Sequence, residues 1–403
     1  MKQGWLLVWA LALAQVVSWG SIYYSFSLFV VPMERDLGWS REWLNGALSL
    51  GLLASGLMAY PVGALIDRGF SRSVMALGSL LGATLLALWS RVESVALFYL
   101  LWLGLGVALA ATLYEPVFAV LTRHFPESYR TRITALTLIG GFASTVFVPL
   151  TQFFITSFGW RGALLALALC NLALALPVHA LLLGEGPRSA KTGQEDSAAR
   201  ALDRAALRRA LRHPVFWALA VCFTAYYANF AALTFHIIPL LDERHVPMSI
   251  IVAAIAVIGP AQVLGRIVLL ALGRKLSAAI AGRIAFLAFP VSVLMLISAH
   301  RSTAALFAFA AVYGAANGVI TIVRGLAVPE LLGREAYGAI NGALTLPANL
   351  ARAAAPFGAA LLWAAAGGYG AVLWAITAGG AVAAVAFWYA AAPGTTAARE
   401  RRS

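Results

Sequence analysis

Ser27-Leu-Phe-Val-Val-Pro32 returns, 207 residues further along the chain, as Thr234-Phe-His-Ile-Ile-Pro239. A second pair of segments keeps nearly the same offset, since Thr134-Ala-Leu-Thr-Leu138 matches Gly342-Ala-Leu-Thr-Leu346, 208 residues later. Both offsets are close to half of the 403 residues. A nearly constant offset of this size indicates an internal duplication. We therefore expect two copies of one structural unit in parallel orientation.

The composition places both copies in a membrane. Hydrophobic residues make up 62% of the chain and charged residues only 11%, and the mean hydropathy is +0.85. The apolar residues form about twelve runs of roughly 20 residues, the length that a helix needs to cross a bilayer. These runs begin near Trp5, Trp43, Ser73, Val95, Ile133, Trp160, Pro214, Ser249, Ala278, Thr303, Tyr337 and Tyr369. They do not alternate as strands of a membrane barrel do, so helices are expected.

We therefore predict an all-α membrane protein with twelve transmembrane helices in two pseudo-symmetric six-helix bundles. The predicted boundaries are an N-terminal bundle at 1–188, a cytoplasmic linker at 189–212 and a C-terminal bundle at 213–403. The linker is polar and rich in charged residues, and Gly184, Gly186 and Gly193 lie before or near its start. Its second part has arginines spaced by four residues, which fits either a helix on an anionic leaflet or a solvated linker helix.

The distribution of basic residues predicts the orientation. The net charge is +13, from 29 Lys and Arg against 16 Asp and Glu. With both termini in the cytoplasm, twenty basic residues fall on the cytoplasmic side, six fall on the opposite side and three lie within the spans. This asymmetry follows the positive-inside rule, so the charge reports topology rather than a nucleic-acid partner. Scarce lysine and abundant alanine favour a bacterial source, and hence the inner membrane.

Three arginines, Arg266, Arg324 and Arg352, lie inside otherwise apolar spans. A charge at mid-bilayer costs at least ~2.5–3.5 kcal/mol, so it is tolerated mainly where it faces a wet cavity or a partner. Three cations with few acids nearby indicate a path for an anion. In the alternative interpretation the arginines are structural. Their charged ends then reach toward the membrane surface, bind carbonyl groups at a helix end or form a fixed salt bridge.

Polar residues accompany these arginines at helical spacing. The tenth span carries a stripe of four polar residues, the eleventh carries another, and the eighth carries a shorter one. Their members are Tyr313, Asn317, Thr321 and Arg324; Asn341, Thr345, Asn349 and Arg352; and Gln262 and Arg266. Lipid cannot face such stripes, so we expect them to line a cavity or to meet polar neighbours. Arginine suits anion binding because its planar fork holds a carboxylate with two hydrogen bonds.

Two titratable residues inside spans are candidates for gating or coupling. Glu115 falls almost one repeat offset before Arg324. It is expected to be a gate partner of Arg324, a structural group at a helix broken by Pro116, or a proton carrier. His236 in the seventh span could titrate near neutral pH, or it could be a buried histidine bonded to a neighbour. Tyr23, Tyr24 and Tyr114 are expected either to pack or to donate hydrogen bonds to a substrate carboxylate.

The loop after the second span, Gly63-Ala-Leu-Ile-Asp67-Arg68-Gly-Phe-Ser-Arg72, resembles the major facilitator superfamily signature G-x-L-x-D-R-x-G-R-R. Phe158-Gly159-Trp160-Arg161 is similar to a second segment of that superfamily. The resemblance implies that Asp67 caps a helix or bridges to a neighbouring one at the cytoplasmic face, and that this bonding breaks as the halves rock. Asp67 and Arg68 are therefore candidates for gating. Within the superfamily, the chain looks like the monocarboxylate and oxalate/formate branch, which implies that Arg266 binds a substrate carboxylate.

These observations predict a secondary active transporter that works by alternating access and moves a small, monocarboxylate-like organic anion, with proton coupling left open. The predicted substrate-binding residues are Arg266, Arg352, Arg324, Gln262, Asn349, Asn317, Tyr23, Tyr24 and Tyr114. The alternative is an exporter of amphipathic or neutral compounds in which the arginines are structural. No enzyme motif, metal-ligand spacing or nucleotide-binding loop occurs in the sequence, so no cofactor or metal is expected. The expected partners are the substrate and the lipid bilayer, and the protein is expected to be a monomer.

Overall fold

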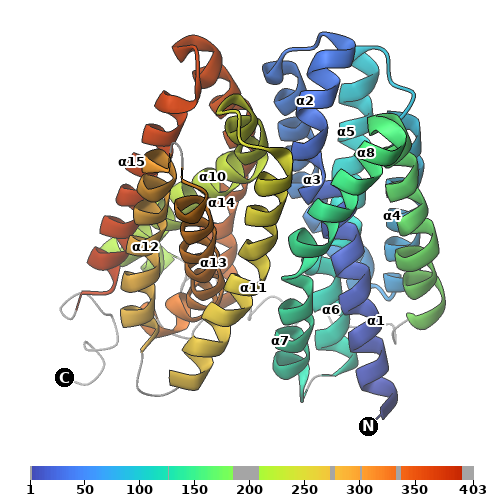
Figure 1. The fold of residues 1–403 in the computed structure, drawn as a ribbon. Helices are drawn as coiled ribbons and strands as arrows, with labels where there is room; N and C mark the ends of the chain where they lie inside the picture. The colour runs from blue at the N-terminus through green and yellow to red at the C-terminus, as the bar shows by residue number, and fades with distance from the viewer. Residues whose placement is uncertain are drawn as a thin grey trace, which may run out of the picture. The chain divides into compact units, whose positions relative to one another are not determined.

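The computed structural model describes residues 2–125, 127–184, 208–272, 277–299, 302–332 and 337–392, and every regular element in these ranges is a helix (Figure 1). The N-terminal half contains α1 (Lys2–Ser18), the π-helical segment η1 (Trp19–Tyr24), α2 (Phe26–Leu37), α3 (Arg41–Asp67), α4 (Ser71–Trp89), α5 (Val95–Thr112), α6 (Tyr114–His124), α7 (Tyr129–Gly140), α8 (Ala143–Cys170), and the π-helical segments η2 (Asn171–Ala175) and η3 (Val178–Leu182). The C-terminal half contains α10 (Pro214–Glu243), α11 (Met248–Leu272), α12 (Ala278–Ser298), α13 (Thr303–Leu331), α14 (Tyr337–Ala366) and α15 (Tyr369–Ala390).

The described helices account for the twelve predicted spans. Ten helical stretches are long and apolar enough to cross a membrane. One of them, Thr131–Leu182, contains two predicted spans, and the backbone of α8 turns between them at Gly159, where φ is +69°. Glycine adopts such a positive φ without the steric penalty that a side chain brings. The remaining span is α14, whose hydropathy is lowered by Asn349 and Arg352. The prediction of a twelve-helix membrane protein is thereby confirmed.

The chain forms two compact units. The first comprises Met1–Ser189, Thr234–Gly259 and Pro356–Leu361, and the second comprises Ala190–Leu233, Pro260–Ala355 and Leu362–Ser403. The predicted bundle boundaries at 188 and 213 stay a prediction. Most of the predicted linker, 189–212, lies outside the described residues.

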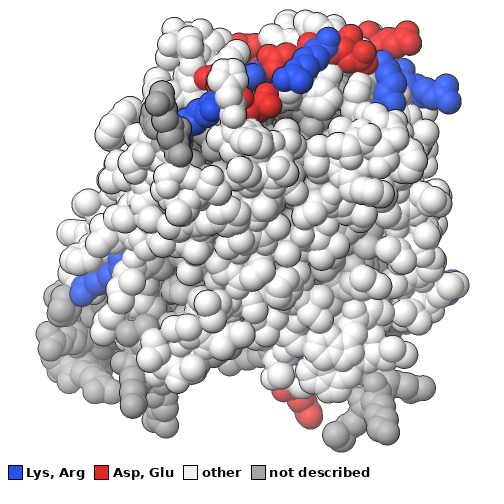
Figure 2. All heavy atoms as spheres, viewed as in Figure 1, with Lys and Arg blue, Asp and Glu red and all other residues white. Residues whose placement is uncertain are grey.

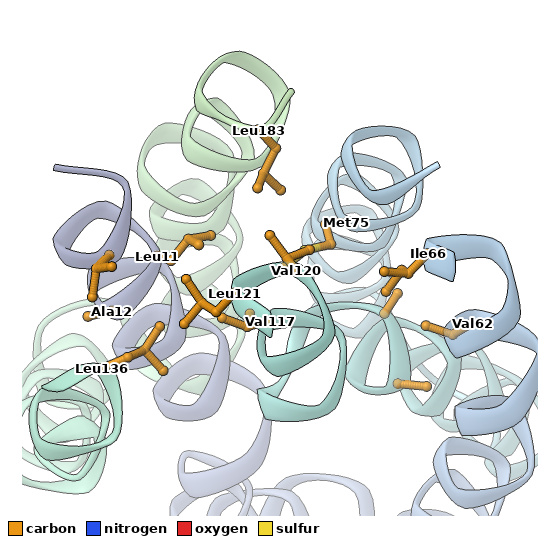
Figure 3. Close-up of a cluster of buried hydrophobic side chains, with 13 residues drawn as sticks. Leu11, Ala12, Val62, Ile66, Met75, Val117, Val120, Leu121, Leu136 and Leu183 are labelled. Atoms are coloured by element: carbon orange, nitrogen blue, oxygen red, sulfur yellow. The ribbon is translucent and has the colours of Figure 1, made fainter. Parts of the chain in front are cut away.

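One core of the first unit lies where α1, α6 and α7 pack together (Figure 3). Leu11 of α1, Val117 and Leu121 of α6, and Leu136 of α7 are fully buried and point toward one another. Side chains from α3 and α4, among them Ile66 and Met75, extend this cluster. Because lipid tails are as apolar as leucine, dense packing of this kind rather than escape from water holds membrane helices together.

Two wide helical turns meet inside the first unit. Ser21 in η1 donates a hydrogen bond to the carbonyl of Val17 at 2.6 Å, and it accepts one from Asn171 Nδ2 at 2.7 Å. Asn171 is the first residue of η2, so this bond joins one π-helical segment to the other. Such segments are rare and occur frequently at functional sites.

The fourth span is broken at Leu113, which separates α5 from α6 and has an extended backbone with ψ of −158°. Pro116 explains the break, because proline lacks the N–H that would reach the carbonyl of Thr112 four residues earlier. Gln15 of α1 replaces that donor, and its Nε2 lies 2.6 Å from the Thr112 oxygen. A backbone carbonyl inside a bilayer needs such a partner. The side chain of Gln15 therefore stabilises the broken helix.

Replacing Gln15 with leucine should lower the free energy of unfolding by about 1–3 kcal/mol, because the buried Thr112 carbonyl loses its donor. Thermal unfolding in detergent measures the change. Gln152→Leu is the matched control, since the described part of the chain gives the Gln152 side chain no hydrogen bond. An equal loss of stability in the two variants would contradict the role assigned to Gln15.

Charged side chains gather at one end of the first unit, where α2 ends, α3 begins and α10 ends (Figure 2). Arg41 is the central member, with Glu34 at 3.1 Å and Glu243 at 3.2 Å. At the edge of the cluster, Arg35 lies 3.5 Å from Asp242. These last two residues are 207 positions apart, which is the offset of the repeat, so the pair joins equivalent positions of the two sequence copies.

Replacing Arg41 with leucine should lower the free energy of unfolding by about 1–3 kcal/mol. It removes two ion pairs and leaves two carboxylates close together, and only 10% of the Arg41 side chain is exposed. Arg35→Ala should change stability by less than about 1 kcal/mol, because 74% of that side chain is exposed. Thermal unfolding in detergent at low and high salt compares the two. A larger effect of Arg35→Ala would refute this ranking.

In the second unit, α12 packs against α13 and α15. Phe286 of α12 stacks on Phe387 of α15 with ring centroids 4.8 Å apart, and Phe289 contacts Tyr313 of α13 at 5.5 Å. These buried rings fix α13, the helix that carries Arg324, within the unit.

Candidate anion-binding site

The guanidinium of Arg324, on α13 in the second unit, lies half-buried between two hydroxyl groups. Its Nη1 donates a hydrogen bond to the Tyr227 hydroxyl at 2.8 Å, and its Nη2 donates to Thr345 Oγ1 at 3.0 Å. Its central carbon also lies 4.8 Å from the centroid of the Tyr227 ring. Within the described part of the second unit, no carboxylate forms an ion pair with Arg324. The charge is therefore held in place by neutral groups.

Thr345 accepts a hydrogen bond from Arg324, and the proton of its own hydroxyl is already donated elsewhere. Its hydroxyl donates to the carbonyl of Asn341 at 2.7 Å, one turn earlier on α14. Because a hydroxyl has a single proton, its oxygen is left to accept from the guanidinium. Two of the polar stripes predicted from sequence, on α13 and α14, therefore meet at this hydrogen bond.

Asn317, one of the predicted binding residues, lies about two turns before Arg324 on α13. The hydroxyl of Tyr226 donates to Asn317 Oδ1 at 2.7 Å, and both residues are buried. Rings of Phe286 and Phe289 pack around Tyr226 at centroid distances of 5.8 and 5.7 Å. The Asn317 amide nitrogen has no hydrogen-bond partner among the described residues, so its N–H groups are free to donate.

The turn that carries Gln262 and Arg266 on α11 packs closely on α13. A Cβ atom at Gly318 would meet the backbone of Gln262, and one at Gly265 would lie 2.6 Å from the carbonyl oxygen of Ala315. Small residues allow helices to approach this closely inside a membrane. Arg266 is 8% exposed, so this guanidinium is buried at or near the crossing of α11 and α13.

The remaining predicted residues of the second unit lie on α14. Asn349 and Arg352, both half-buried, follow Thr345 by four and seven residues. At 1.5 Å per residue, Arg352 lies about 10 Å along the helix from Thr345. The structure thus joins Arg324 directly to Tyr227 and Thr345, and it places Gln262 and Arg266 on α11 and Asn349 and Arg352 on α14, two of the helices that contact α13.

Aromatic side chains form a cluster in the first unit, in which Tyr23 is fully buried and the other members are half-buried. Trp19, Tyr23 and Tyr24 come from η1, and Tyr114 is the first residue after the break in the fourth span. The Trp19 ring lies 5.0 Å from Tyr23, 6.1 Å from Tyr24 and 5.2 Å from Tyr114. The cluster therefore sits where two spans depart from regular helix. Sequence reasoning chose the three tyrosines but not Trp19.

Glu115 is exposed and lies in the first turn of α6, directly after the break. The break agrees with the structural interpretation of Glu115 and Pro116, and a carboxylate is favourable at a helix N-terminus. Glu115 and Arg324 belong to different units, so their pairing stays a prediction.

His236 is 1% exposed, and its Nε2 lies 2.8 Å from the carbonyl oxygen of Pro356. This hydrogen bond favours the interpretation of His236 as a structural residue over that of a proton carrier. The side chain of Asp67, the last residue of α3, lies outside the described part of the structure. Arg68 is exposed, and its backbone N–H donates to the carbonyl of Ala64. Their predicted gating role stays a prediction.

Twelve helical spans with charged and polar side chains inside them are typical of membrane transport proteins. Residues 11–289 match the family model of the Major Facilitator Superfamily. The chain therefore belongs to the major facilitator superfamily, whose members are transporters rather than enzymes. This confirms the family resemblance and identifies the protein as a multi-pass membrane transporter.

Several relatives of this chain are monocarboxylate transporters. Monocarboxylate transporter 13 from Bos taurus is 28% identical over 345 residues, which cover 82% of this chain and 76% of the relative. Monocarboxylate transporter 11 from Homo sapiens is 33% identical over 188 residues, which cover 45% of this chain and 38% of the relative.

Solved structures share the fold. A bacterial homolog of the human lysosomal transporter Spinster has a TM-score of 0.73 at 16% identity, with 96% of each chain covered. The nucleoside transporter NupG has a TM-score of 0.74 at 15% identity, with 96% of this chain and 99% of that chain covered.

Proposed function

We propose that this transporter moves a small organic anion of the monocarboxylate type across the membrane by alternating access. In this mechanism two six-helix bundles, close to the predicted ranges 1–188 and 213–403, expose a midplane site to each side of the membrane in turn. Arg266, Arg324 and Arg352 supply the positive charge of that site. The names of the relatives support a monocarboxylate as the substrate class.

The geometry of Arg324 carries the proposal. A salt-bridged arginine would have its charge cancelled before any substrate arrived. Arg324 is instead held by Tyr227 and Thr345, which fix its orientation and leave its charge in place. A half-buried guanidinium in this state attracts an anion strongly, because the low local dielectric raises the Coulomb energy. Its planar fork suits a carboxylate.

The aromatic cluster of Trp19, Tyr23, Tyr24 and Tyr114 favours a substrate with an apolar body. The same cluster is also the observation that supports the alternative function, an exporter of amphipathic or neutral compounds with structural arginines. The two functions differ in one property. An anion carrier needs the charge of the arginines for binding, and an exporter of neutral compounds does not.

The transmembrane orientation also belongs to the proposal. The excess of basic residues in the predicted cytoplasmic loops favours cytoplasmic termini, and the composition favours a bacterial inner membrane. Proton coupling would use Glu115, the exposed acid at the break of the fourth span. The bond from His236 to Pro356 makes His236 the weaker candidate.

A thermal-stabilisation screen tests the proposed function. The purified protein in detergent is mixed with acetate, pyruvate, lactate, benzoate or oxalate, and its unfolding temperature is measured. A ligand that binds only the folded state raises that temperature by mass action. We expect at least one anion to stabilise the parent protein and to lose this effect in Arg266→Ala. Arg35→Ala, which changes an exposed arginine, is the control that should keep it.

Two outcomes would contradict the proposal. If no anion of the panel stabilises the parent protein, the substrate class is wrong. If the anions stabilise Arg266→Ala as well as the parent, Arg266 does not bind the anion, and the exporter with structural arginines becomes the better interpretation.

A further inference from the structure

We propose that the hydroxyl of Tyr227 is a donor of the anion site and binds the substrate carboxylate together with the guanidinium of Arg324. The inference rests on the proposed function and deepens it. Tyr227 lies on α10 in the second unit and was not among the residues chosen from sequence.

The count of hydrogens at the Tyr227 hydroxyl is the first support. A tyrosine hydroxyl has one proton to donate and lone pairs that accept. At Tyr227 the oxygen accepts from Arg324 Nη1 at 2.8 Å. Among the described residues, no acceptor receives the Tyr227 proton. Tyr227 is half-buried, and a buried tyrosine hydroxyl usually finds such an acceptor. The missing acceptor can come from a bound ligand.

The guanidinium beside it has the same surplus of donors. Arginine carries five N–H groups and no acceptor. Tyr227 and Thr345 each take one of them, so three remain. The site therefore presents N–H and O–H donors around one positive charge. An ionised carboxylate only accepts hydrogen bonds, so it satisfies these groups, whereas an amine or an ammonium ion would bring further donors.

Both donors are also held in place. The Tyr227 ring lies 4.8 Å from the guanidinium carbon, and Thr345 is locked as an acceptor by its bond to the Asn341 carbonyl. A preformed pair of donors loses little freedom when a ligand binds, which raises the affinity for a ligand of matching geometry.

The neighbouring residue, Tyr226, differs from Tyr227 because its hydroxyl proton already has an acceptor. Its hydroxyl proton is committed to Asn317 Oδ1 at 2.7 Å, and its ring is buried among phenylalanines. Two adjacent tyrosines on one helix therefore differ in whether the proton is available. The same substitution at each position separates a loss of ligand binding from a loss of packing.

The test compares Tyr227→Phe, Tyr226→Phe and Tyr60→Phe, the last at an exposed position on α3. For the parent and each variant, the dissociation constant of the most stabilising anion of the panel (acetate, pyruvate, lactate, benzoate or oxalate) is measured. Loss of a hydrogen bond to a charged group should weaken binding by Tyr227→Phe roughly tenfold to a hundredfold. The unfolding temperature without ligand should fall only slightly, because Arg324 loses one acceptor but is half-buried and keeps its bond to Thr345. Tyr226→Phe should lower the unfolding temperature with a smaller loss of affinity, and Tyr60→Phe should match the parent.

A second measurement needs no variant. In the parent protein with ring-labelled tyrosine, addition of the same anion should shift a tyrosine band in the infrared difference spectrum, because a hydroxyl gains an acceptor. Equal affinity in Tyr227→Phe and the parent, or no tyrosine shift on binding, would overturn the role of Tyr227 and leave the proposed function standing. Failure of every anion to bind the parent would overturn both.

Discussion

Replacement of Arg324 by glutamine should reduce anion uptake into proteoliposomes, expressed as Vmax/KM, by roughly 10²- to 10⁴-fold. Each hydrogen bond to a charged group contributes about 1.5–3 kcal/mol, and a carboxylate on the arginine fork makes two. Glutamine keeps a polar side chain but loses the charge and the fork. The loss should fall on anion recognition, because Tyr227 and Thr345 can still hydrogen-bond to the new amide.

Arg324→Lys is the matched control for charge. Lysine keeps the positive charge but has no planar fork. Anion uptake by Arg324→Lys should therefore fall between that of the parent and that of Arg324→Gln. Uptake of a labelled anion, with the protein content of the vesicles measured in parallel, gives the comparison. If Arg324→Gln transports as well as the parent, the charge at this position is structural.

Replacement of Gly318 by alanine should destabilise the protein at least as much as the substitutions at Gln15 and Arg41. The added Cβ would overlap the backbone of Gln262 on α11, and backbone atoms cannot move aside as a flexible side chain can. Overpacking of this kind usually costs about 1–3 kcal/mol and sometimes more. Arg266 lies at or near the same helix crossing, so Gly318→Ala should also reduce the stabilisation that a bound anion gives. Thermal unfolding of the detergent-solubilised protein measures both effects.

Gly325, which is also on α13, provides the matched control for Gly318. A Cβ there meets no atom within 4 Å. Gly325→Ala should leave stability unchanged or raise it by up to about 1 kcal/mol, because alanine favours helix more than glycine does. Similar unfolding temperatures for the two variants would show that α11 and α13 do not pack as closely as the structure indicates.

The sequence predicted the architecture because the signals for it are long and redundant. Apolar runs of span length allow only helices, and the offset between Ser27–Pro32 and Thr234–Pro239 required no structural knowledge. The turn at Gly159 was also predictable, since Phe158-Gly159-Trp160-Arg161 falls between two apolar runs. The structure adds that Gly159 has a positive φ.

The local irregularities were only partly predictable. Pro116 indicated a broken helix near Glu115, but nothing in the sequence could identify Gln15 as the residue that satisfies the freed Thr112 carbonyl. These two residues are 97 positions apart, and only the packing of α1 on α5 brings them together. The π-helical segments likewise have no reliable sequence signal of their own.

The sequence pattern indicated Arg324 as a candidate but did not indicate its hydrogen-bond partner Tyr227. Arg324 and Thr345 were visible as polar residues at helical spacing within apolar spans. Tyr227 follows Tyr226 in an apolar run, and a tyrosine in such a place more often packs than binds. Its selection needed the hydrogen-bond geometry, in which Tyr226 is committed to Asn317 and Tyr227 faces Arg324.

Calorimetric titration with carboxylate and amide pairs tests most directly whether the buried arginines recognise an anion. The pairs are acetate with acetamide, lactate with lactamide and benzoate with benzamide, in which each partner has nearly the same shape. The charge and donor pattern of Arg324 and Tyr227 predicts saturable heat for at least one carboxylate and none for its amide. Equal binding of both members of a pair, or binding of an amide alone, would contradict anion recognition.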